Sequence, residues 1–93
     1  MYMFCKAYAL GQIESGRSDS GDWVRRTLVC SAIDDEAKLI AFDAFGQKKC
    51  EKLGEIQQGQ ILKVFYTIEA REREGKWYNR VNLERFESYT QKS

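Results

Sequence analysis

The sequence predicts an all-β domain with one short helix, and three features of its 93 residues lead to this prediction. Stretches rich in aromatic and β-branched residues alternate apolar and polar side chains, as strands do. Proline is absent, so the turns depend on Gly, Asn, Asp and Ser. One segment instead spaces its apolar residues three apart, as on a helix. The length favours a single domain spanning residues 1–93 with one compact core.

The first half of the chain contains three predicted strands. Residues 2–13 are rich in Tyr, Phe, Met and Ala and form the first strand. The stretch ESGRSDSGD, residues 14–22, is predicted to be a flexible loop. The segment DWVRRTLVCSAI, residues 22–33, forms the second strand. An acidic hairpin tip at residues 34–36 then leads into the third strand, KLIAFDAF, residues 38–45.

A short amphipathic helix is predicted over residues 47–57. Cys50, Leu53 and Ile56 lie three apart, while lysines and glutamates occupy the other side. Gly54 weakens this helix, because glycine has a low helix propensity.

Two further strands form the second half. Residues 61–73, ILKVFYTIEARER, alternate with period two, which predicts a fourth strand. The turn REGK at residues 73–76 has a glycine suited to a short hairpin. The fifth strand covers residues 76–88, and the polar tail at 89–93 is expected to fray.

The order of three strands, a short helix and two strands predicts the OB-fold, a five-stranded Greek-key barrel with its helix between the third and fourth strands. An open antiparallel sheet with one covering helix would have the same order. A closed barrel removes the exposed edges that such a small sheet would leave.

Composition excludes several function classes. The chain has no histidine, so it lacks His-based acid–base chemistry and the commonest metal ligand. Its three cysteines are widely spaced, which argues against a disulfide framework and a zinc site. No apolar run is long enough for a membrane span, and no signal peptide is evident. We therefore expect a cytoplasmic protein that is not an enzyme and has no metal or cofactor.

The stretch AFGQKKCEKLGEIQQGQILKVFYTIEAREREGKWYNRVNLERF resembles the second half of bacterial and phage single-stranded-DNA-binding proteins. In that family a strand ending in Phe-Gly leads into a short Lys-containing helix, and a basic, aromatic hairpin precedes the last strand. The segment SGDWVRRTLVCSA is also similar, especially to short uncharacterised members of Bacteroidetes type. The resemblance implies an OB-fold, single-stranded DNA as the partner, and self-association as a dimer or tetramer.

Strand alternation separates inward from outward side chains in the second strand. Leu28 and Cys30 belong to an apolar set, whereas Trp23 and Arg25 lie on the opposite face. Arg26 interrupts the apolar set and is expected at an open end of the barrel. Trp23 and Arg25 are therefore candidates to stack on a base and contact a phosphate. The alternative is a tryptophan packed on a loop or against another subunit.

The third strand ends in the stretch FDAFG, residues 42–46, and Asp43 indicates which face of this strand points outward. An apolar core would not accept an unpaired Asp43, so the face that carries it points outward together with Phe45. Phe42 then belongs to the core. The resemblance implies that Phe45, just before Gly46, stacks on a base. Alternatives are that Phe45 packs beneath a loop or between subunits, and that Asp43 neutralises Arg25.

Basic residues in the helix and the last hairpin complete the predicted binding set. Phosphate contacts are assigned to Lys48, Arg71, Arg73 and Lys76. Spacing groups Trp77 with the inward residues, which leaves Tyr78 outside for stacking. Acidic residues interleave with the arginines, so a charge-balanced exposed hairpin is the other interpretation.

The sequence as a whole predicts single-stranded DNA binding without strong sequence preference. RNA is not separated from DNA by these residues. The rival interpretation is a protein–protein interaction or assembly module, in which Trp23, Phe45 and Phe65 form an interface and no nucleic acid is bound. The net charge of +1 favours the rival, and the pairing of aromatic with basic residues favours the binder.

Overall fold

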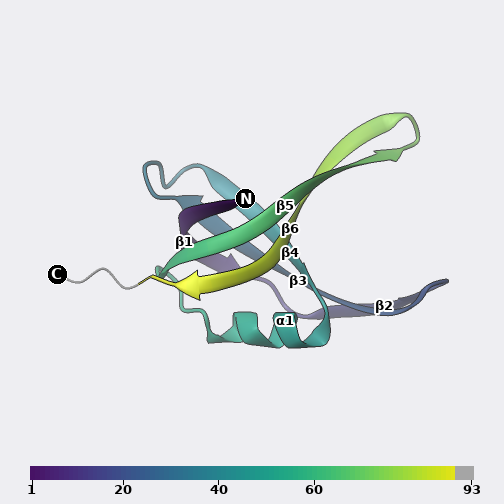
Figure 1. The fold of residues 1–93 in the computed structure, drawn as a ribbon, viewed down its shortest axis with the longest axis horizontal. Helices are drawn as coiled ribbons and strands as arrows, with labels where there is room; N and C mark the ends of the chain where they lie inside the picture. The colour runs from purple at the N-terminus through teal and green to yellow at the C-terminus, as the bar shows by residue number, and fades with distance from the viewer. Residues whose placement is uncertain (90–93) are drawn as a thin grey trace.

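The structure, a computed structural model, describes residues 1–89 and is built almost entirely of strands (Figure 1). The single short α-helix lies beneath the strands, between β4 and β5 in the chain. The elements are β1 Tyr2–Leu10, β2 Glu14–Ser18, β3 Gly21–Ala32, β4 Leu39–Phe45, α1 Gln47–Lys52, a 3₁₀ turn Leu53–Glu55, β5 Ile61–Arg73 and β6 Lys76–Ser88.

The strand pairings close into a ring, as in an OB-fold barrel. β1 pairs antiparallel with both β3 and β5, β3 pairs with β4, and β5 pairs with β6. A short parallel contact between β4 and β6, with Asp43 opposite Asn82, joins the two ends. The predicted fold is confirmed, and the ring of pairings distinguishes it from an open sheet.

The core fills the inside of this ring. Phe42 of β4 is fully buried at its centre, and its ring meets Tyr66 of β5 edge to face at 5.6 Å. α1 covers one end of the barrel and contributes the buried Cys50. Leu53 of the following 3₁₀ turn is also fully buried, and Ile56 is partly buried against the core. The three residues of the predicted apolar face therefore do turn toward the core, although only Cys50 belongs to the α-helix.

The expected flexible loop at residues 14–22 is wrong, because residues 14–18 form β2. This strand pairs with the start of β3 from Glu14 opposite Arg25 to Ser18 opposite Gly21. The polar composition suggested a loop, since both faces of this hairpin are open to solvent. Backbone pairing needs no apolar side chains, so a polar arm can still be a regular ladder.

The helix is shorter than the predicted residues 47–57. α1 ends at Lys52, a 3₁₀ turn follows, and the backbone is extended again at Ile56. Gly54 lies in the 3₁₀ turn, consistent with its low helix propensity. The first strand is also shorter than expected and stops at Leu10.

A second arm is formed by the far halves of β5 and β6, which extend beyond the barrel on the same side as the β2–β3 arm (Figure 1). Glu74 and Gly75 make its turn, both with positive φ, at 54° and 79°. Two such residues give the twist that suits a two-residue hairpin. The arms raise the radius of gyration to 14.2 Å, above the roughly 12 Å of a compact chain of this length.

The end of the chain is anchored as far as the structure describes it. The backbone N–H of Tyr89 donates to the carbonyl of Ile61 at 2.9 Å, so the predicted fraying does not begin at residue 89. The rest of the predicted tail, residues 90–93, lies outside the described residues. None of the helices among residues 1–89 has the length and apolar character needed to cross a membrane.

Candidate nucleic-acid interface

The outer surface of β3 and β4 carries two exposed aromatic rings with an arginine between them. We call the surface made by Trp23, Arg25, Phe45 and Arg80 the β3–β4 face. Trp23 and Phe45 are each 38% exposed. Arg25 lies directly opposite Phe45 in the strand register, and its guanidinium is 5.8 Å from the centre of the Trp23 ring. The outward orientation predicted for Phe45 from Asp43 is confirmed.

The β2–β3 arm fixes the position of Trp23. Gly16 of β2 is the register partner of Trp23, and the indole lies across it. A Cβ atom at residue 16 would be only 2.5 Å from Cζ2 of the indole. The glycine therefore provides the space in which the tryptophan ring lies flat against the arm.

Arg25 is held by a carboxylate on β2. Its Nε and Nη2 atoms both donate to Oε2 of Glu14, at 3.1 and 2.7 Å. This hydrogen bond raises the pKa of Arg25 above its usual value, and the charge of Asp43 adds a smaller effect in the same direction. The suggestion that Asp43 is the partner of Arg25 is therefore wrong. Glu14 lies closer, because β2 pairs with β3.

Asp43 is instead engaged with its other neighbours. The Thr27 hydroxyl donates to Oδ1 of Asp43 at 2.8 Å, and Nε of Arg80 lies 4.0 Å from Oδ2. The Arg80 guanidinium also covers Phe45, 5.5 Å from the ring centre. Sequence reasoning did not assign Arg80 to the site. Its spacing of two from Tyr78 could have placed it on the same face of β6.

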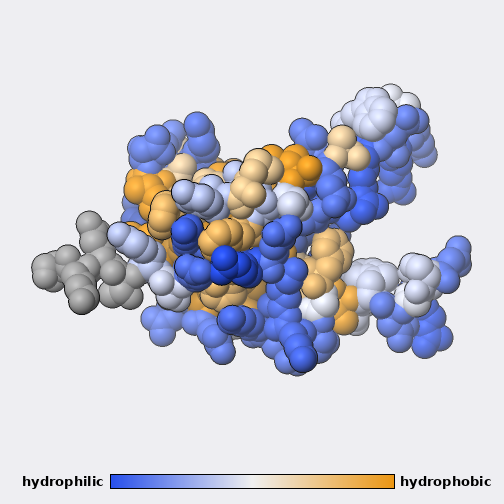
Figure 2. Space-filling model, viewed as in Figure 1, coloured by the Kyte–Doolittle hydropathy of each residue, from blue (hydrophilic) through white to orange (hydrophobic). Residues whose placement is uncertain are grey.

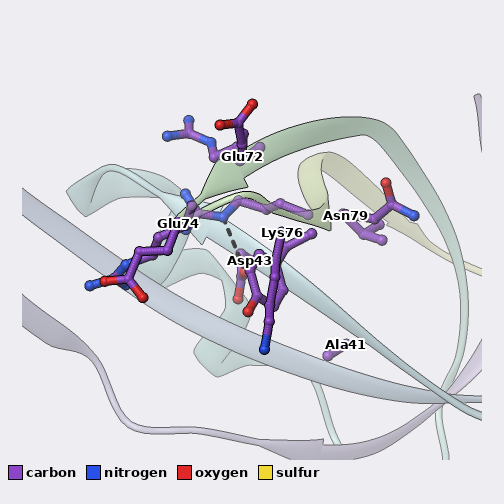
Figure 3. A pocket seen from close by; sticks show the side chains of 11 residues that line it. Ala41, Asp43, Glu72, Glu74, Lys76 and Asn79 are labelled. Atoms are coloured by element: carbon purple, nitrogen blue, oxygen red, sulfur yellow. Dashed lines mark ion pairs between the residues drawn. The ribbon is translucent and has the colours of Figure 1, made fainter.

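An open groove of about 850 Å³ runs between β4 and the β5–β6 arm (Figure 3). Asp43 and Ala41 form the β4 side, and Lys76, Tyr78 and Arg80 are among the residues of the arm. The ion pair of Arg80 with Asp43, drawn as a dashed line, crosses the groove near the barrel. The groove thus continues the β3–β4 face outward along the arm.

The cations of the arm are exposed and only partly neutralised. Arg71 lies 3.8 Å from Glu69 of its own strand. Within the described chain, Arg73 and Lys76 have no carboxylate within 4.0 Å. All three line the groove, together with Glu72 and Glu74. The structure therefore brings the predicted arm cations together in one place.

Trp77 is not inward, contrary to the spacing prediction. It is 69% exposed, and Tyr78 is 55% exposed. Both rings are open because the arm extends past the barrel, where neither face of the hairpin meets a core. Tyr78 lines the groove, as expected for a residue on the outer face.

Two further basic residues, Lys48 and Arg26, lie near α1 and outside the groove. Lys48 is exposed on α1, and among residues 1–89 it shares no hydrogen bond or ion pair with the other predicted residues. Arg26 closes the end of the barrel, where it donates to the carbonyls of Gly11 at 2.7 Å and Cys50 at 3.1 Å. Arg26 is therefore a structural residue, as its place in the apolar pattern suggested.

The cysteines belong to the core. All three are unpaired as disulfides and fully buried, and burial raises the pKa of the Cys50 thiol. In the part of the chain that the structure describes, no group of three or more Cys, Asp or Glu residues could hold a metal ion.

Comparison with solved structures supports the OB-fold architecture described above. The crystal structure of a small single-stranded DNA-binding protein from Streptomyces coelicolor aligns with a TM-score of 0.51 over 96% of this chain and 92% of that chain. At 13% identity this likeness concerns the fold alone. The chain belongs to the family described as a domain of unknown function, DUF3127, which matches residues 6–87. No curated protein matches the sequence.

Proposed function

We propose that the β3–β4 face and the adjoining groove bind single-stranded DNA without strong sequence preference. The observation that supports this most directly is the pair of exposed rings, Trp23 and Phe45, each with a guanidinium within 6 Å of its centre. OB-folds bind oligonucleotides on their second and third barrel strands and on two of their loops. In this chain those strands are β3 and β4, and the two loops are the projecting arms.

The chemistry of the surface fits an unpaired strand. Exposed aromatic rings stack on bases of any type, since every base has a π face. The arm cations Arg71, Arg73 and Lys76, with Arg25 and Lys48, would contact phosphates. Stacking on such rings tolerates any base, which is why we propose binding without strong sequence preference.

The proposed cellular role, location and oligomeric state are predictions from the sequence. A role in replication, recombination or repair and a likeness to the short Bacteroidetes-type proteins are predictions from the resemblance. A cytoplasmic location is a prediction from the composition. Self-association as a dimer or tetramer would lengthen the binding surface of a chain whose net charge is only +1. The solved relative is described as a single-stranded DNA-binding protein, and RNA remains the second nucleic acid to test.

One observation favours the rival function of protein–protein interaction without nucleic acid. Both arginines beside the rings already face carboxylates, Arg25 that of Glu14 and Arg80 that of Asp43. Paired arginines have less free positive charge to offer phosphates, on which non-specific nucleic-acid binding depends.

Tryptophan fluorescence can separate these two functions. The chain has two tryptophans, so Trp77→Phe leaves Trp23 as the only reporter. Titration with oligothymidine should quench Trp23, and the affinity should fall as salt is raised. No change with about tens of micromolar DNA at low salt, where non-specific binders are usually saturated, would refute DNA binding.

Phe45→Ala tests the second ring. Loss of one stacking surface is expected to cost about 1–3 kcal/mol, or roughly five- to 150-fold in affinity. Tyr8→Ala is the matched control, because Tyr8 is also an exposed ring but lies on β1. If Phe45→Ala instead changes the oligomeric state and leaves the affinity per site intact, Phe45 belongs to an interface between subunits.

A further inference from the structure

A second cluster of aromatic residues, with Tyr2 and Phe4 exposed and Phe65 half-buried, lies where β1 pairs with β5. We call Tyr2, Phe4, Lys63, Phe65 and Arg85 the lysine-centred patch. The strand register places Tyr2 opposite Phe65 and Phe4 opposite Lys63. Nζ of Lys63 lies 4.4 Å from the ring centre of Tyr2, 5.2 Å from that of Phe65 and 5.8 Å from that of Phe4. A single ammonium group is thus surrounded by three rings.

The patch is separate from the β3–β4 face. In the ring of pairings, β1 and β5 lie between β3 on one side and β6 on the other, away from β4. None of the patch residues lines the groove beside β4. Figure 2 shows that hydrophobic residues over β5 and β6 are interrupted by strongly hydrophilic ones, so the surface is mixed in character.

The arginine of the patch forms a flat stack. The Arg85 guanidinium lies 3.7 Å from the centre of the Phe65 ring, on the strand next to it. Its Nη1 atom donates to Glu87 at 2.7 Å. Guanidinium planes and aromatic rings are the two surfaces on which proteins stack unpaired bases. Tyr2 adds a second ring, 57% exposed.

The charge at the centre indicates what the patch would bind. Among residues 1–89, no carboxylate lies within 4.0 Å of the Lys63 ammonium; its register partner Glu87 is bound to Arg85 instead. A two-fold contact centred on this patch would bury both Lys63 ammonium groups near one another with no carboxylate of the patch to neutralise them. A cation ringed by aromatic side chains fits an anionic ligand with flat groups, which is the chemistry of a single strand.

We propose that the lysine-centred patch is a second subsite for single-stranded nucleic acid, on the side of the barrel away from the β3–β4 face. Lys63 would hold a phosphate, and Tyr2 and the Arg85–Phe65 stack would carry bases. This inference rests on the proposed function of the β3–β4 face. It implies that a long strand contacts more of the barrel than the β3–β4 face alone.

Lys63→Gln and Tyr2→Ala test the subsite with a long oligothymidine of about 30 nucleotides, well beyond the roughly 4–16 that one OB-fold covers. Tyr2→Ala should weaken binding about five- to 150-fold. Lys63→Gln should reduce the slope of log affinity against log salt by about 0.7, the value for one lost phosphate contact on a single strand. Both variants should keep the quenching of Trp23.

Two matched variants serve as controls. Lys52→Gln removes a lysine that also lies over a ring, 5.7 Å from the centre of Phe86, but on α1. Tyr2→Phe keeps the ring and should keep the affinity. Size-exclusion chromatography and sedimentation record the oligomeric state of every variant.

The outcomes separate the two proposals. If Lys63→Gln and Tyr2→Ala bind like the wild type while Phe45→Ala is impaired, the subsite is refuted and the proposed function stands. If the two variants alter the oligomeric state with unchanged affinity per chain, the patch is an interface between copies and the subsite is again refuted. If the wild type binds no oligonucleotide, both proposals fail.

Discussion

The ion pair between Arg25 and Glu14 predicts that removing the acidic residue improves the binding of single-stranded DNA to the β3–β4 face. In the protein without DNA, Arg25 donates twice to one oxygen of Glu14. A phosphate that binds Arg25 must compete with this carboxylate and is also repelled by it. Glu14→Gln removes the negative charge and keeps the shape of the side chain, so we expect tighter binding of single-stranded DNA.

The size of the effect follows from the exposure of the pair. The side chains of Arg25 and Glu14 are 34% and 57% exposed, so solvent screens their attraction. Exposed pairs contribute about 0.2–1 kcal/mol. Glu14→Gln should therefore raise the affinity by roughly 1.4- to fivefold. The free energy of unfolding should fall by a similar amount, since the folded protein loses the same contact.

The assay is the titration of Trp23 fluorescence at low ionic strength, with urea unfolding for stability. Asp22→Asn is the matched control, because it removes one charge from the same arm. Asp22 pairs with Arg17, and both side chains are more than 70% exposed. An affinity for Glu14→Gln that does not exceed that of Asp22→Asn would show that only net charge matters, and that Arg25 holds no phosphate.

Three further predictions concern the arm and the core. Gly16→Val should displace the indole of Trp23 from the β2–β3 arm, because a side chain at residue 16 would overlap the ring. The fluorescence emission of Trp23 should shift, and DNA binding should weaken about as much as in Trp23→Ala. An unchanged emission spectrum would show that Gly16 does not make room for the ring. Phe42→Ala should lower the free energy of unfolding by about 3–5 kcal/mol, measured by urea titration, because the ring is fully buried. Iodoacetamide should label the three cysteine thiols only after the protein is unfolded, because all three are buried and burial raises the pKa of Cys50. Fast labelling of the folded protein, detected by mass spectrometry, would contradict this. The thiols are those of Cys5, Cys30 and Cys50.

Local pattern was enough to predict which residues of β4 face inward. Phe42 and Phe45 are three apart, so a strand places them on opposite faces. The cost of burying Asp43 then decided which face is outside. The structure confirms both steps, with Phe42 fully buried and Phe45 exposed. Strand period and the cost of desolvating a carboxylate both act within a few residues, so a short stretch of sequence is enough to fix this orientation.

The same local reasoning failed where side chains did not meet the core. The polar residues of β2 predict a loop, and the phase of Trp77 with apolar residues further along β6 predicts an inward side chain; the structure shows a strand and an exposed ring. Both belong to arms that leave the barrel. Alternation predicts burial only where a core lies beneath one face of the strand.

The sequence by itself determined the five strands of the barrel, the place of the helix between the third and fourth of them, and core residues such as Leu28 and Phe42. Only the tertiary structure decided the partners of the surface charges, such as Glu14 for Arg25 and the three rings around Lys63. Most of these contacts join different strands, and their identity depends on which strands pair and in which register. A shift of one residue in that register would exchange every partner, which is why alternation within one strand could not reveal them.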